Sequence, residues 1–482
     1  MNKSMVFKIT GIILQIESLL LLLPAIVSLI YKESAVWAYI ISAGLSALLG
    51  TLLRIVFKPK STLIYAREGL VIVALCWIFM SLLGCLPFII SREIPNFFNA
   101  FFETVSGFTT TGASILSGAQ LDAMSKGNLF WRSFTHWIGG MGVLVFVTAV
   151  IPNMSDRSIH IIKAEMPGPI VGKLVPKVKD TSRVLYLIYI VLTLLEIVFL
   201  VCGDMSLFES SLYTFGTAGT GGFSINSTGI TSPYAQWVIT IFMLIFGVNF
   251  NLYYLMLMRR VRQAIKSEEL WFYILMVIGC IAAISVSIFK ALPEFTEVGE
   301  TIRQVSFHVA SFVTTTGFTL SDINLWPTFA KSVMFMLMFT GACAGSTAGG
   351  LKLSRVIIIF KTIKKEFQRL IHPRSIRTIK FEGKALDNVT RHGVTAYLAI
   401  YMICILFIFL LISLNGVSFE TNVTATVSCF NNIGPAFDSA FANYNCFNAF
   451  SKVVLAFAML LGRLEIYPLL LAMSFKTWSK KY

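Results

Sequence analysis

Long apolar runs alternate with short polar connections along the whole chain, and this pattern predicts a polytopic membrane protein. A helix needs about 20 apolar residues to cross a hydrocarbon core. Ten spans are expected, at residues 6–30, 36–57, 68–90, 129–150, 183–203, 235–258, 269–290, 328–358, 392–414 and 450–473. The first run is too long for the apolar core of a signal peptide, so we expect it to remain as a span.

Four shorter amphipathic stretches interrupt this pattern after the first pair of spans. They are too short to cross a membrane and lie at Asn99–Phe108, Leu207–Ala218, Thr301–Val313 and Thr421–Phe430. Each precedes a loop and then another span, which is typical of a re-entrant pore helix. Irregular backbone at membrane depth is tolerated only where protein buries it or water lines it, so we expect the four loops to meet at a shared interior.

The predicted fold is therefore all-α, with four membrane–pore-helix–membrane units around a central pore and an additional N-terminal helix pair. The corresponding segments are 1–60 for the helix pair, 61–152 for unit 1, 153–265 for unit 2 with a basic connection, 266–370 for unit 3 and 371–482 for unit 4.

The four loops share threonine and glycine residues at matching positions. Their sequences are Thr109–Ser114, Gly219–Ser224, Thr314–Thr319 and Asn431–Pro435. Glycine reaches positive φ at no steric cost, so its carbonyl can turn toward a central axis. One such loop would be read as an ordinary turn, but four copies favour a filter whose backbone carbonyls replace the hydration shell of a cation.

Charge supports a cation rather than an anion. The partly negative C-terminus of each short helix would point toward the centre. Acidic residues are also expected on the outer side, at Glu103, Asp204, Glu209, Asp322, Glu420 and Asp438.

The net charge of +15 lies in alternate loops and is not a nucleic-acid footprint. Lys and Arg concentrate at 152–183, 259–266 and 355–391, whereas 204–234 has none and 291–327 has only Arg303. The positive-inside rule then places both termini in the cytoplasm. This distribution of charge does not indicate a nucleic-acid-binding protein.

A glycine-rich run, Gly341 to Gly350 followed by Lys352, lies in the middle of the eighth expected span. Each mid-helix glycine costs roughly 1 kcal/mol relative to Ala, so the segment is expected to unwind and to act as a gate beneath the filter. The spacing of Gly341, Gly345 and Gly349 is equally typical of a close-packing helix face. Both interpretations remain open from the residues alone.

Other polar residues in the apolar runs are less decisive. Arg463 in the last span is expensive unless it faces water or a partner, so it is either a pore barrier or part of a structural ion pair. His136 is expected to be a packing residue rather than a proton relay, and His308 is undecided. The eight cysteines are expected as buried hydrophobes, although Cys429 and Cys446 lie on the outer side and a disulfide between them is a minor alternative.

The four loops, Trp137–Gly142, Gly345–Lys352 and Gly462–Glu465 together resemble the Trk/Ktr/HKT superfamily of cation transporters. The likeness is closest to the bacterial Trk-type (TrkH) potassium uptake membrane subunit and covers essentially the whole chain. It implies K⁺ as the transported ion, coordinated by Thr110, Thr111, Gly112, Thr220, Gly221, Gly222, Thr315, Thr316, Gly317, Asn432, Ile433 and Gly434. It also implies a gate formed by Gly345, Ser346, Thr347, Gly349, Gly350, Lys352 and Arg463.

The resemblance further implies a homodimer in the bacterial inner membrane and a cytosolic, nucleotide-binding regulatory ring (TrkA-like) docked on the basic face. The chain has no G-x-x-x-x-G-K-[ST] or G-x-G-x-x-G motif, so we expect no organic cofactor and nucleotide control only through that partner. The Thr220-Gly221 and Asn432-Ile433 pairs depart from the Thr-Thr of the other two loops and make the filter only approximately four-fold.

The expected function is K⁺ uptake through a gated, channel-like pore, driven mainly by the membrane potential. A Na⁺- or H⁺-coupled symporter of the same superfamily is the alternative, although no chain of carboxylates in the spans favours it. A broken-helix secondary transporter of small solutes fits the four-fold repeat less well. No hydrolase or metalloenzyme motif is present, so the chain is not expected to be an enzyme.

Overall fold

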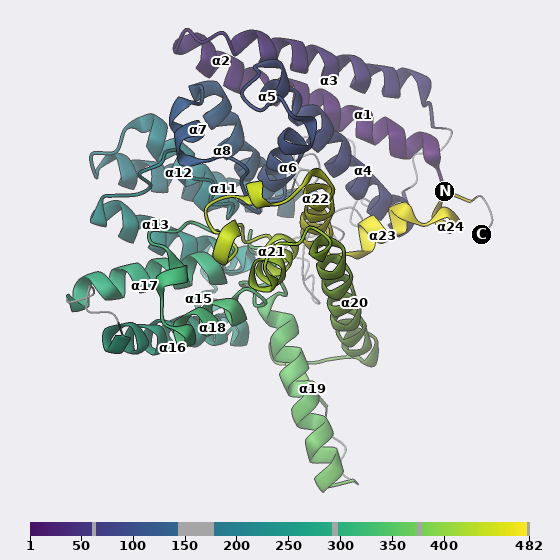
Figure 1. Cartoon of the computed structure of the whole chain (residues 1–482). Coiled ribbons are helices and arrows are strands. Elements are labelled where there is room, and N and C mark those ends of the chain that lie inside the picture. The colour runs from purple at the N-terminus through teal and green to yellow at the C-terminus, as the bar shows by residue number, and fades with distance from the viewer. Residues whose placement is uncertain (60–63, 143–177, 292–296, 374–377, 480–482) are drawn as a thin grey trace.

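The computed structural model describes residues 1–59, 64–142, 178–291, 297–373 and 378–479 of the chain. Almost all ordered elements in these ranges are helices, arranged around a central region in which α21 lies (Figure 1). The end of the expected span 129–150, the boundary between units 1 and 2 and the basic residues Arg157, Lys163, Lys173, Lys177, Arg374 and Arg377 lie outside the described residues.

An N-terminal layer of helices covers one side of the molecule, drawn in purple in Figure 1. It consists of α1 (Lys3–Leu20), α2 (Leu22–Ile30) and α3 (Val36–Val56). A Cβ atom on Gly11 would lie 2.6 Å from the carbonyl oxygen of Gly50, and one on Gly50 would lie 2.7 Å from that of Gly11. Helices α1 and α3 therefore touch through their backbones, as small residues permit between membrane helices.

The rest of the chain follows as four successive groups of helices. The first group is α4 (Ala66–Gly84), α5 (Leu86–Ile90), α6 (Phe97–Phe108), α7 (Gly118–Ala123) and α8 (Lys126–Gly140). The second is α11 (Val178–Val201), α12 (Leu207–Gly219), α13 (Pro233–Phe246), α14 (Phe250–Leu257) and α15 (Val261–Ile265).

The third and fourth groups complete the described chain. The third is α16 (Glu268–Ala291), α17 (Val298–Val313), η2 (Ile323–Leu325), α18 (Thr328–Leu337) and α19 (Leu353–Ile371). The fourth is β1 (Lys380–Phe381), β2 (Lys384–Ala385), α20 (Asn388–Ser413), α21 (Phe419–Asn431), η3 (Asp438–Ala440), η4 (Tyr444–Cys446), α22 (Ala449–Arg463), α23 (Tyr467–Met473) and α24 (Phe475–Trp478).

Within the described ranges, six helical segments are long and apolar enough to cross a membrane: Lys3–Ile30, Val36–Val56, Arg67–Ile90, Arg183–Val201, Glu268–Phe289 and Asn388–Ser413. A seventh is obtained if α13 and α14 form one span, which is bent by 87°. The expected spans 328–358 and 450–473 are each divided into shorter helices, and the described part of 129–150 is the short helix α8.

The four amphipathic stretches form the short helices α6, α12, α17 and α21, and each ends at one of the predicted loops. Polar side chains fix three of their starts: Asn96, Ser206 and Ser418 accept hydrogen bonds from backbone N–H groups of the first turn. Such caps satisfy donors that a helix start leaves without intrahelical partners. The sequence-based placement of these helices agrees with the structure to within a few residues.

The helix at the expected span 235–258 is not continuous, because it breaks between α13 and α14 at Gly247, Val248 and Asn249. The span 450–473 also breaks, where Glu465 and Ile466 take positive φ angles of 58° and 66°. Positive φ is a rare conformation for a β-branched residue such as isoleucine. The helix after each of the four loops thus ends or bends at about the same distance from its loop, at α8, α13, α18 and α22.

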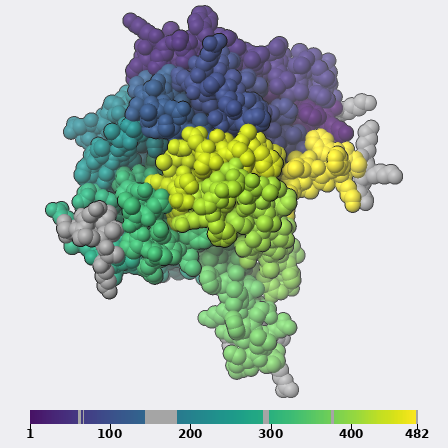
Figure 2. Space-filling view, in the orientation of Figure 1, coloured from purple at the N-terminus to yellow at the C-terminus, as the bar shows by residue number. Residues whose placement is uncertain are grey.

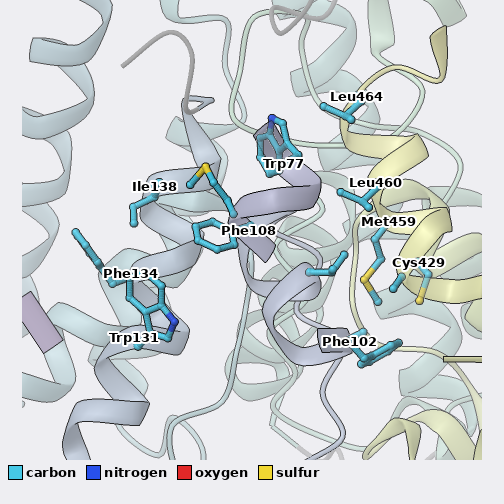
Figure 3. Close-up of a cluster of buried hydrophobic side chains, with 14 of the residues drawn as sticks. Trp77, Phe102, Phe108, Trp131, Phe134, Ile138, Cys429, Met459, Leu460 and Leu464 are labelled. Atoms are coloured by element: carbon cyan, nitrogen blue, oxygen red, sulfur yellow. The ribbon is translucent and has the colours of Figure 1, made fainter. Parts of the chain in front are cut away.

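Aromatic side chains fill the core between the first and fourth groups (Figure 3). Phe108 of α6 and Trp131 of α8 pack edge to face with ring centroids 5.8 Å apart. The Trp131 indole N–H donates to the Gly84 carbonyl at 2.9 Å, so its polar atom is satisfied within the core. Met459 and Leu460 of α22 close the same core and thereby fix α22 beside α6.

Helix α19 extends away from the body of the molecule (Figures 1 and 2). Its first turn is buried, whereas its distal half exposes apolar side chains, with Phe367 63% and Leu370 78% exposed. Lys364, Lys365 and Arg369 lie on the same distal half. The helix is therefore amphipathic beyond the body of the protein.

Candidate functional site

The four loops adopt one backbone conformation despite their different sequences. One or two residues after each short helix, a residue lies in the left-handed region, with φ of 55° at Thr110, 57° at Thr220, 56° at Thr315 and 56° at Asn432. Two residues later, φ is positive again at Gly112, Gly222, Gly317 and Gly434. Left-handed threonines are costly, and such strain is found mainly where function requires a specific backbone path.

One backbone hydrogen bond recurs in all four loops. The middle residue donates its N–H to a carbonyl five residues earlier, from Thr111 to Ser106 at 2.9 Å and from Gly221 to Gly216 at 2.8 Å. The matching bonds run from Thr316 to Ser311 at 2.8 Å and from Ile433 to Ser428 at 3.0 Å. Each loop is thus tied to its own helix in the same way, which turns the carbonyl of the middle residue away from that helix.

The loops also contact one another in a closed cycle. A methyl group on Gly112 would overlap the carbonyl oxygen of Gly221, and one on Gly222 would overlap that of Thr316. In the same way Gly317 faces the carbonyl oxygen of Ile433, and Gly434 faces that of Thr111 at 2.5 Å from its would-be Cβ. Each glycine is therefore required so that the carbonyl of the next loop can approach.

These four contacts define what we call the loop ring, formed by residues 110–112, 220–222, 315–317 and 432–434. Within the described ranges, the carbonyl oxygens of Thr111, Gly221, Thr316 and Ile433 accept no hydrogen bond from the protein. Buried carbonyls are normally paired. Four unpaired carbonyls in one ring have the chemistry that suits a monovalent cation stripped of part of its hydration shell.

Side-chain hydrogen bonds connect and stabilise the loops of the ring. Asn432 donates its side-chain amide to the Thr111 hydroxyl at 3.0 Å and to the Met459 carbonyl at 2.9 Å, which joins the fourth loop to the first and to α22. The hydroxyls of Thr109 and Thr111 lie 2.8 Å apart, as do those of Thr314 and Thr316. Asn432 stands where the other three loops have threonine, and its side-chain amide therefore supplies a hydrogen bond between loops.

Glu103, which we expected on the outer side, is not an exposed carboxylate. It is buried on α6 and forms an ion pair with Arg132 of α8 at 2.7 Å. Glu103 also accepts from the Ile115 N–H at 2.9 Å, and Arg132 donates to the Ser224 carbonyl at 3.0 Å. The pair thus braces the first and second loops, and a lone arginine in an apolar span was the sequence signal that could have revealed it.

The glycine-rich loop, defined here as residues 338–352, is not helical. Gly341, Gly345 and Gly349 therefore do not form a helix-packing face, and the unwound alternative is the one that the structure contains. The Gly341 N–H donates to the Leu351 carbonyl at 3.0 Å, which closes the loop on itself.

The glycine-rich loop lies against the loop ring on one side and the α13–α14 break on the other. The Gly349 N–H donates to the Thr315 hydroxyl at 2.7 Å. Toward the break, the Cys343 N–H donates to the Gly247 carbonyl at 3.1 Å, and the Phe250 N–H donates to the Gly345 carbonyl at 3.1 Å. The broken helix of the second group therefore holds the unwound segment of the third.

Arg463 bridges three of the four groups at this level. Its guanidinium donates to the Thr347 carbonyl at 2.8 Å and to the carbonyls of Gly139 and Gly140 at 2.5 and 2.7 Å. Glu465, two residues further along the chain, pairs with Arg355 of α19. Arg463 is thus a cation attached to the glycine-rich loop, directly beneath the ring.

Lys352 is buried at the end of the glycine-rich loop and donates to the Ala348 carbonyl. A cavity opens beside it. The lining comes from the glycine-rich loop, the ends of α8, α14 and α22, and the helices α4 and α11, and it includes Gly140, Phe250, Gly345, Ser346, Gly349, Gly350, Lys352 and Arg463. All the residues expected to form the gate except Thr347 line this cavity. The Thr347 carbonyl accepts a hydrogen bond from Arg463, which is part of the lining.

Buried acids within the candidate spans were missed by the sequence analysis. Glu17 of α1 and Glu196 of α11 are fully buried within membrane-spanning helices. The Glu17 carboxylate has no hydrogen-bond partner within the described part of the chain, and the Glu196 carboxylate lies near the Thr217 hydroxyl of α12. Their isolation in long apolar runs explains why no series of carboxylates was recognised.

Two buried histidines have packing roles, and four of the eight cysteines are buried, whereas Cys202 is exposed. His136 is buried, with Nδ1 2.9 Å from the Gly107 carbonyl and its ring 4.3 Å from that of Phe223, which agrees with the expected packing role. His308 accepts from the Leu320 N–H at 3.2 Å and so supports the loop after α17. Cys429 and Cys446 are both free.

This architecture is that of a polytopic helical membrane protein in which four short helices end at the loop ring. The sequence profile of the family described as "TrkH: Cation transport protein" matches residues 38–482. The chain belongs to this family of cation transport proteins, and it is a member of a transporter family rather than an enzyme family.

Characterised relatives align over almost the full length. The chain is 32% identical to the Trk system potassium uptake protein TrkH of Escherichia coli K12 over 477 residues, covering 98% of both chains. It is 31% identical to the Trk system potassium uptake protein TrkG of the same organism, covering 99% of this chain and 100% of the relative. The crystal structure of the potassium transporter TrkH from Vibrio parahaemolyticus superimposes with a TM-score of 0.89 at 28% identity, covering 99% and 100% of the two chains.

Proposed function

We propose that this protein takes K⁺ into the cell through a gated, channel-like pore whose selectivity filter is the loop ring. The observation that carries the proposal is the closed cycle in which each ring glycine faces the carbonyl oxygen of the next loop. Potassium is favoured among cations because the relatives that align over the whole chain are potassium uptake proteins. The membrane potential supplies about 2.3 kcal/mol per univalent cation and per 100 mV, enough for roughly 50-fold accumulation.

The finer architecture belongs to the same proposal. Six long helices and the bent pair α13–α14 account for seven of the ten expected spans. The other three, 129–150, 328–358 and 450–473, complete the set if each is a broken membrane crossing rather than one straight helix. Four membrane–pore-helix–membrane units then surround one pore. Short helices that end at matching loops support this arrangement, and so do the four second helices that stop beneath them.

The gate in this proposal is the glycine-rich loop together with Arg463. A cation that leaves the ring inward meets the guanidinium, which repels it, and the glycine-rich loop, which occupies its path. Support comes from the hydrogen bonds that join Thr315, Gly349, Thr347 and Arg463 in one sequence of contacts. Opening requires these contacts to part, and glycines lower the cost of such a rearrangement.

A cytosolic nucleotide-binding ring (TrkA-like) and a second copy of this chain are the proposed partners, and the bacterial inner membrane with cytoplasmic termini is the proposed location. The projecting helix α19 with its basic residues supports a cytosolic docking site. Co-purification with the ring and the mass of the detergent-solubilised complex test the two partners. Reporter fusions at each terminus test the orientation.

Flux into proteoliposomes tests the function. The purified protein should take up ⁸⁶Rb⁺ in preference to ²²Na⁺, at a rate that rises with an inside-negative potential and falls when the potential is collapsed. Equal entry of both ions would contradict a carbonyl filter. Absence of flux with the protein alone and in the presence of its nucleotide-bound ring would contradict the pore itself.

A coupled symporter is the second candidate because Glu17 and Glu196 are carboxylates buried in membrane spans. Ionisable groups inside a membrane are expensive and mark ion or proton pathways in many transporters. A proton-coupled mechanism predicts acidification of the proteoliposome interior during Rb⁺ entry, even when the potential is clamped. A channel-like pore predicts no such proton movement.

A further inference from the structure

The start of α16 is capped by a residue from a distant part of the chain. The Ser267 hydroxyl and the Glu269 N–H both donate to Oε1 of Glu382, at 2.9 and 3.0 Å. Glu382 lies in the turn of the β1–β2 hairpin, residues 380–385, which follows α19. An acceptor at this position satisfies the N–H groups that a helix start leaves without partners.

The hairpin places Glu382 at a backbone cost. Glu382 and Gly383 have φ angles of 49° and 76°, the two positive values of a tight hairpin turn in which Asn and Gly are the preferred residues. A glutamate in the left-handed region is uncommon, and strain of this kind marks positions whose side chain has a task. Here the side chain reaches the first turn of α16.

The Glu269 side chain continues the connection to the glycine-rich loop. Its Oε1 accepts from the Ala344 N–H at 2.8 Å and from the Ser354 N–H at 3.0 Å. Ala344 lies in the glycine-rich loop, and Ser354 lies in the first turn of α19 just after it. One buried carboxylate oxygen therefore ties the loop to the helix that leaves it.

The hairpin is also fixed to α19. Phe381 packs with Ile357 and Ile358 in a small apolar cluster, and the Lys361 ammonium donates to the Lys380 carbonyl at 2.8 Å. Lys361 in addition pairs with Glu268 of α16. The turn itself, Glu382 to Lys384, is exposed, so a cytosolic protein can contact it.

We propose that Glu382 and Glu269 act in series as positioning residues that hold the glycine-rich loop in its closed arrangement, so that displacement of the hairpin releases the loop. Without the Glu382 acceptor, the first turn of α16 loses its cap and Glu269 loses its fixed position. Ala344 and Ser354 then lose their shared acceptor. The consequence for ion flux rests on the proposed function, whereas the coupling of hairpin and loop does not.

The native thiol of Cys343 reports on the glycine-rich loop independently of transport. Cys343 is buried next to Ala344. In a background with the other seven cysteines replaced by serine or alanine, the rate of modification by a small methanethiosulfonate measures how often the loop opens. We expect Glu269→Ala and Glu382→Ala each to raise this rate about tenfold, the effect of losing one hydrogen bond to a charged group.

Conservative variants separate positioning from charge. Both bonds to each glutamate end on a single oxygen, which a glutamine retains as its carbonyl. Glu269→Gln and Glu382→Gln should therefore label at close to the wild-type rate. The matched control is Glu366→Ala, which removes an exposed α19 carboxylate paired only loosely with Arg369 at 3.4 Å.

The double variant Glu269→Ala/Glu382→Ala decides whether the two residues act in series. Residues in one network are not additive, so the double variant should label no faster than Glu269→Ala alone. Additive effects, or wild-type labelling in Glu382→Ala, would overturn the linkage. If Glu269→Ala does not fold, as judged by size-exclusion chromatography, the comparison of Glu382→Ala with Glu382→Gln carries the test.

Rb⁺ flux through the same variants separates the two proposals. Faster labelling together with faster Rb⁺ entry supports both the linkage and the gate. Faster labelling in a protein that conducts no ions under any condition supports the linkage and contradicts the proposed function. Unchanged labelling in a protein with normal selective flux supports the pore and overturns the linkage.

Discussion

The loop ring is uniform in structure, whereas the layer beneath it, formed by the ends of the helices that follow the four loops, is not. In the ring, four different sequences reach one conformation, with the same two positive φ positions and the same backbone hydrogen bond in every loop. In the layer beneath, the four second helices all stop or bend, but each by its own device. These are the end of α8, the glycine break after α13, the long glycine-rich loop after α18 and the strained pair Glu465-Ile466 after α22.

The difference separates two physical requirements. Ion coordination needs equivalent oxygen atoms around an axis, so backbone geometry is repeated even where side chains differ. Gating needs one element with two arrangements, so only one quadrant has to carry a flexible segment while its neighbours hold it. The asymmetric contacts of Arg463 and Asn249 with that segment are therefore as informative as the symmetry above them.

The largest effect is expected at the buried pair that braces the ring. Glu103→Ala leaves the Arg132 charge buried and removes the acceptor for the Ile115 N–H, which should lower the free energy of unfolding by roughly 3–5 kcal/mol. Equilibrium denaturation in detergent micelles measures it. Glu300→Ala is the matched control, because the exposed pair of Glu300 and Arg303 should contribute only about 0–1 kcal/mol. Equal losses in the two variants would mean that the ring needs no such brace.

The ring itself should be sensitive to a single added side chain. Gly317→Ser introduces a Cβ at φ +84° that overlaps the Ile433 carbonyl, so the ratio of Rb⁺ to Na⁺ flux should fall by roughly tenfold or more. Gly416→Ser is the control, because it adds the same strain at φ +71° with open space around it. An unchanged ratio of Rb⁺ to Na⁺ flux in Gly317→Ser would mean that the ring does not determine ion selectivity.

In the layer beneath, the expected change is in rate rather than in selectivity. Arg463→Gln retains hydrogen-bond donors but removes the charge, which should raise basal Rb⁺ flux about tenfold, since a nearby unit charge costs a passing cation ~1–4 kcal/mol. Arg463→Lys keeps the charge and should remain close to wild type in flux. If both variants conduct equally, charge is not what closes the pathway.

The smallest effect is expected on the outer side, at Asp438 in η3. The hydroxyls of Ser418 and Thr421 donate to its carboxylate and hold the pKa of Asp438 below its ordinary value. The resulting stabilisation is complete above about pH 4 and is lost as the pH falls through that lowered pKa. Asp438→Asn should therefore flatten the acid end of the stability profile by under ~1 kcal/mol, since the group is exposed. A steeper profile in the variant would contradict this assignment.

The repeating features of this protein could be predicted from the sequence because each has a local cause. Hydrophobic run lengths indicated the long helices, and the short amphipathic stretches before Thr- and Gly-rich loops indicated α6, α12, α17 and α21. Four glycines in one run indicated unwinding at residues 338–352. All of these signals lie within a single stretch of chain.

What the sequence analysis missed depends on contacts between distant segments. The break at Gly247 is stabilised by bonds to the glycine-rich loop, nearly a hundred positions away, in addition to the local cap that Asn249 provides for α14. The positive φ of Ile466 contradicts its intrinsic preference and follows from its surroundings. The buried ion pair of Glu103 was not foreseen, because its partner, Arg132, is brought to it only by the packing of α6 on α8.

The cycle of glycine contacts has a consequence for how the protein is made. The ring closes only where the fourth loop meets the first, through Gly434 and Thr111 and through the bond from Asn432 to Thr111 across 321 positions of sequence. A ribosome therefore delivers the first three loops into the membrane before the residue that completes their ring exists. Until α21 and α22 insert, unpaired carbonyls in that partial ring are exposed to lipid, where an unsatisfied backbone group costs several kcal/mol. Assembly of the ring thus depends on water or an insertion factor that shelters its first three loops.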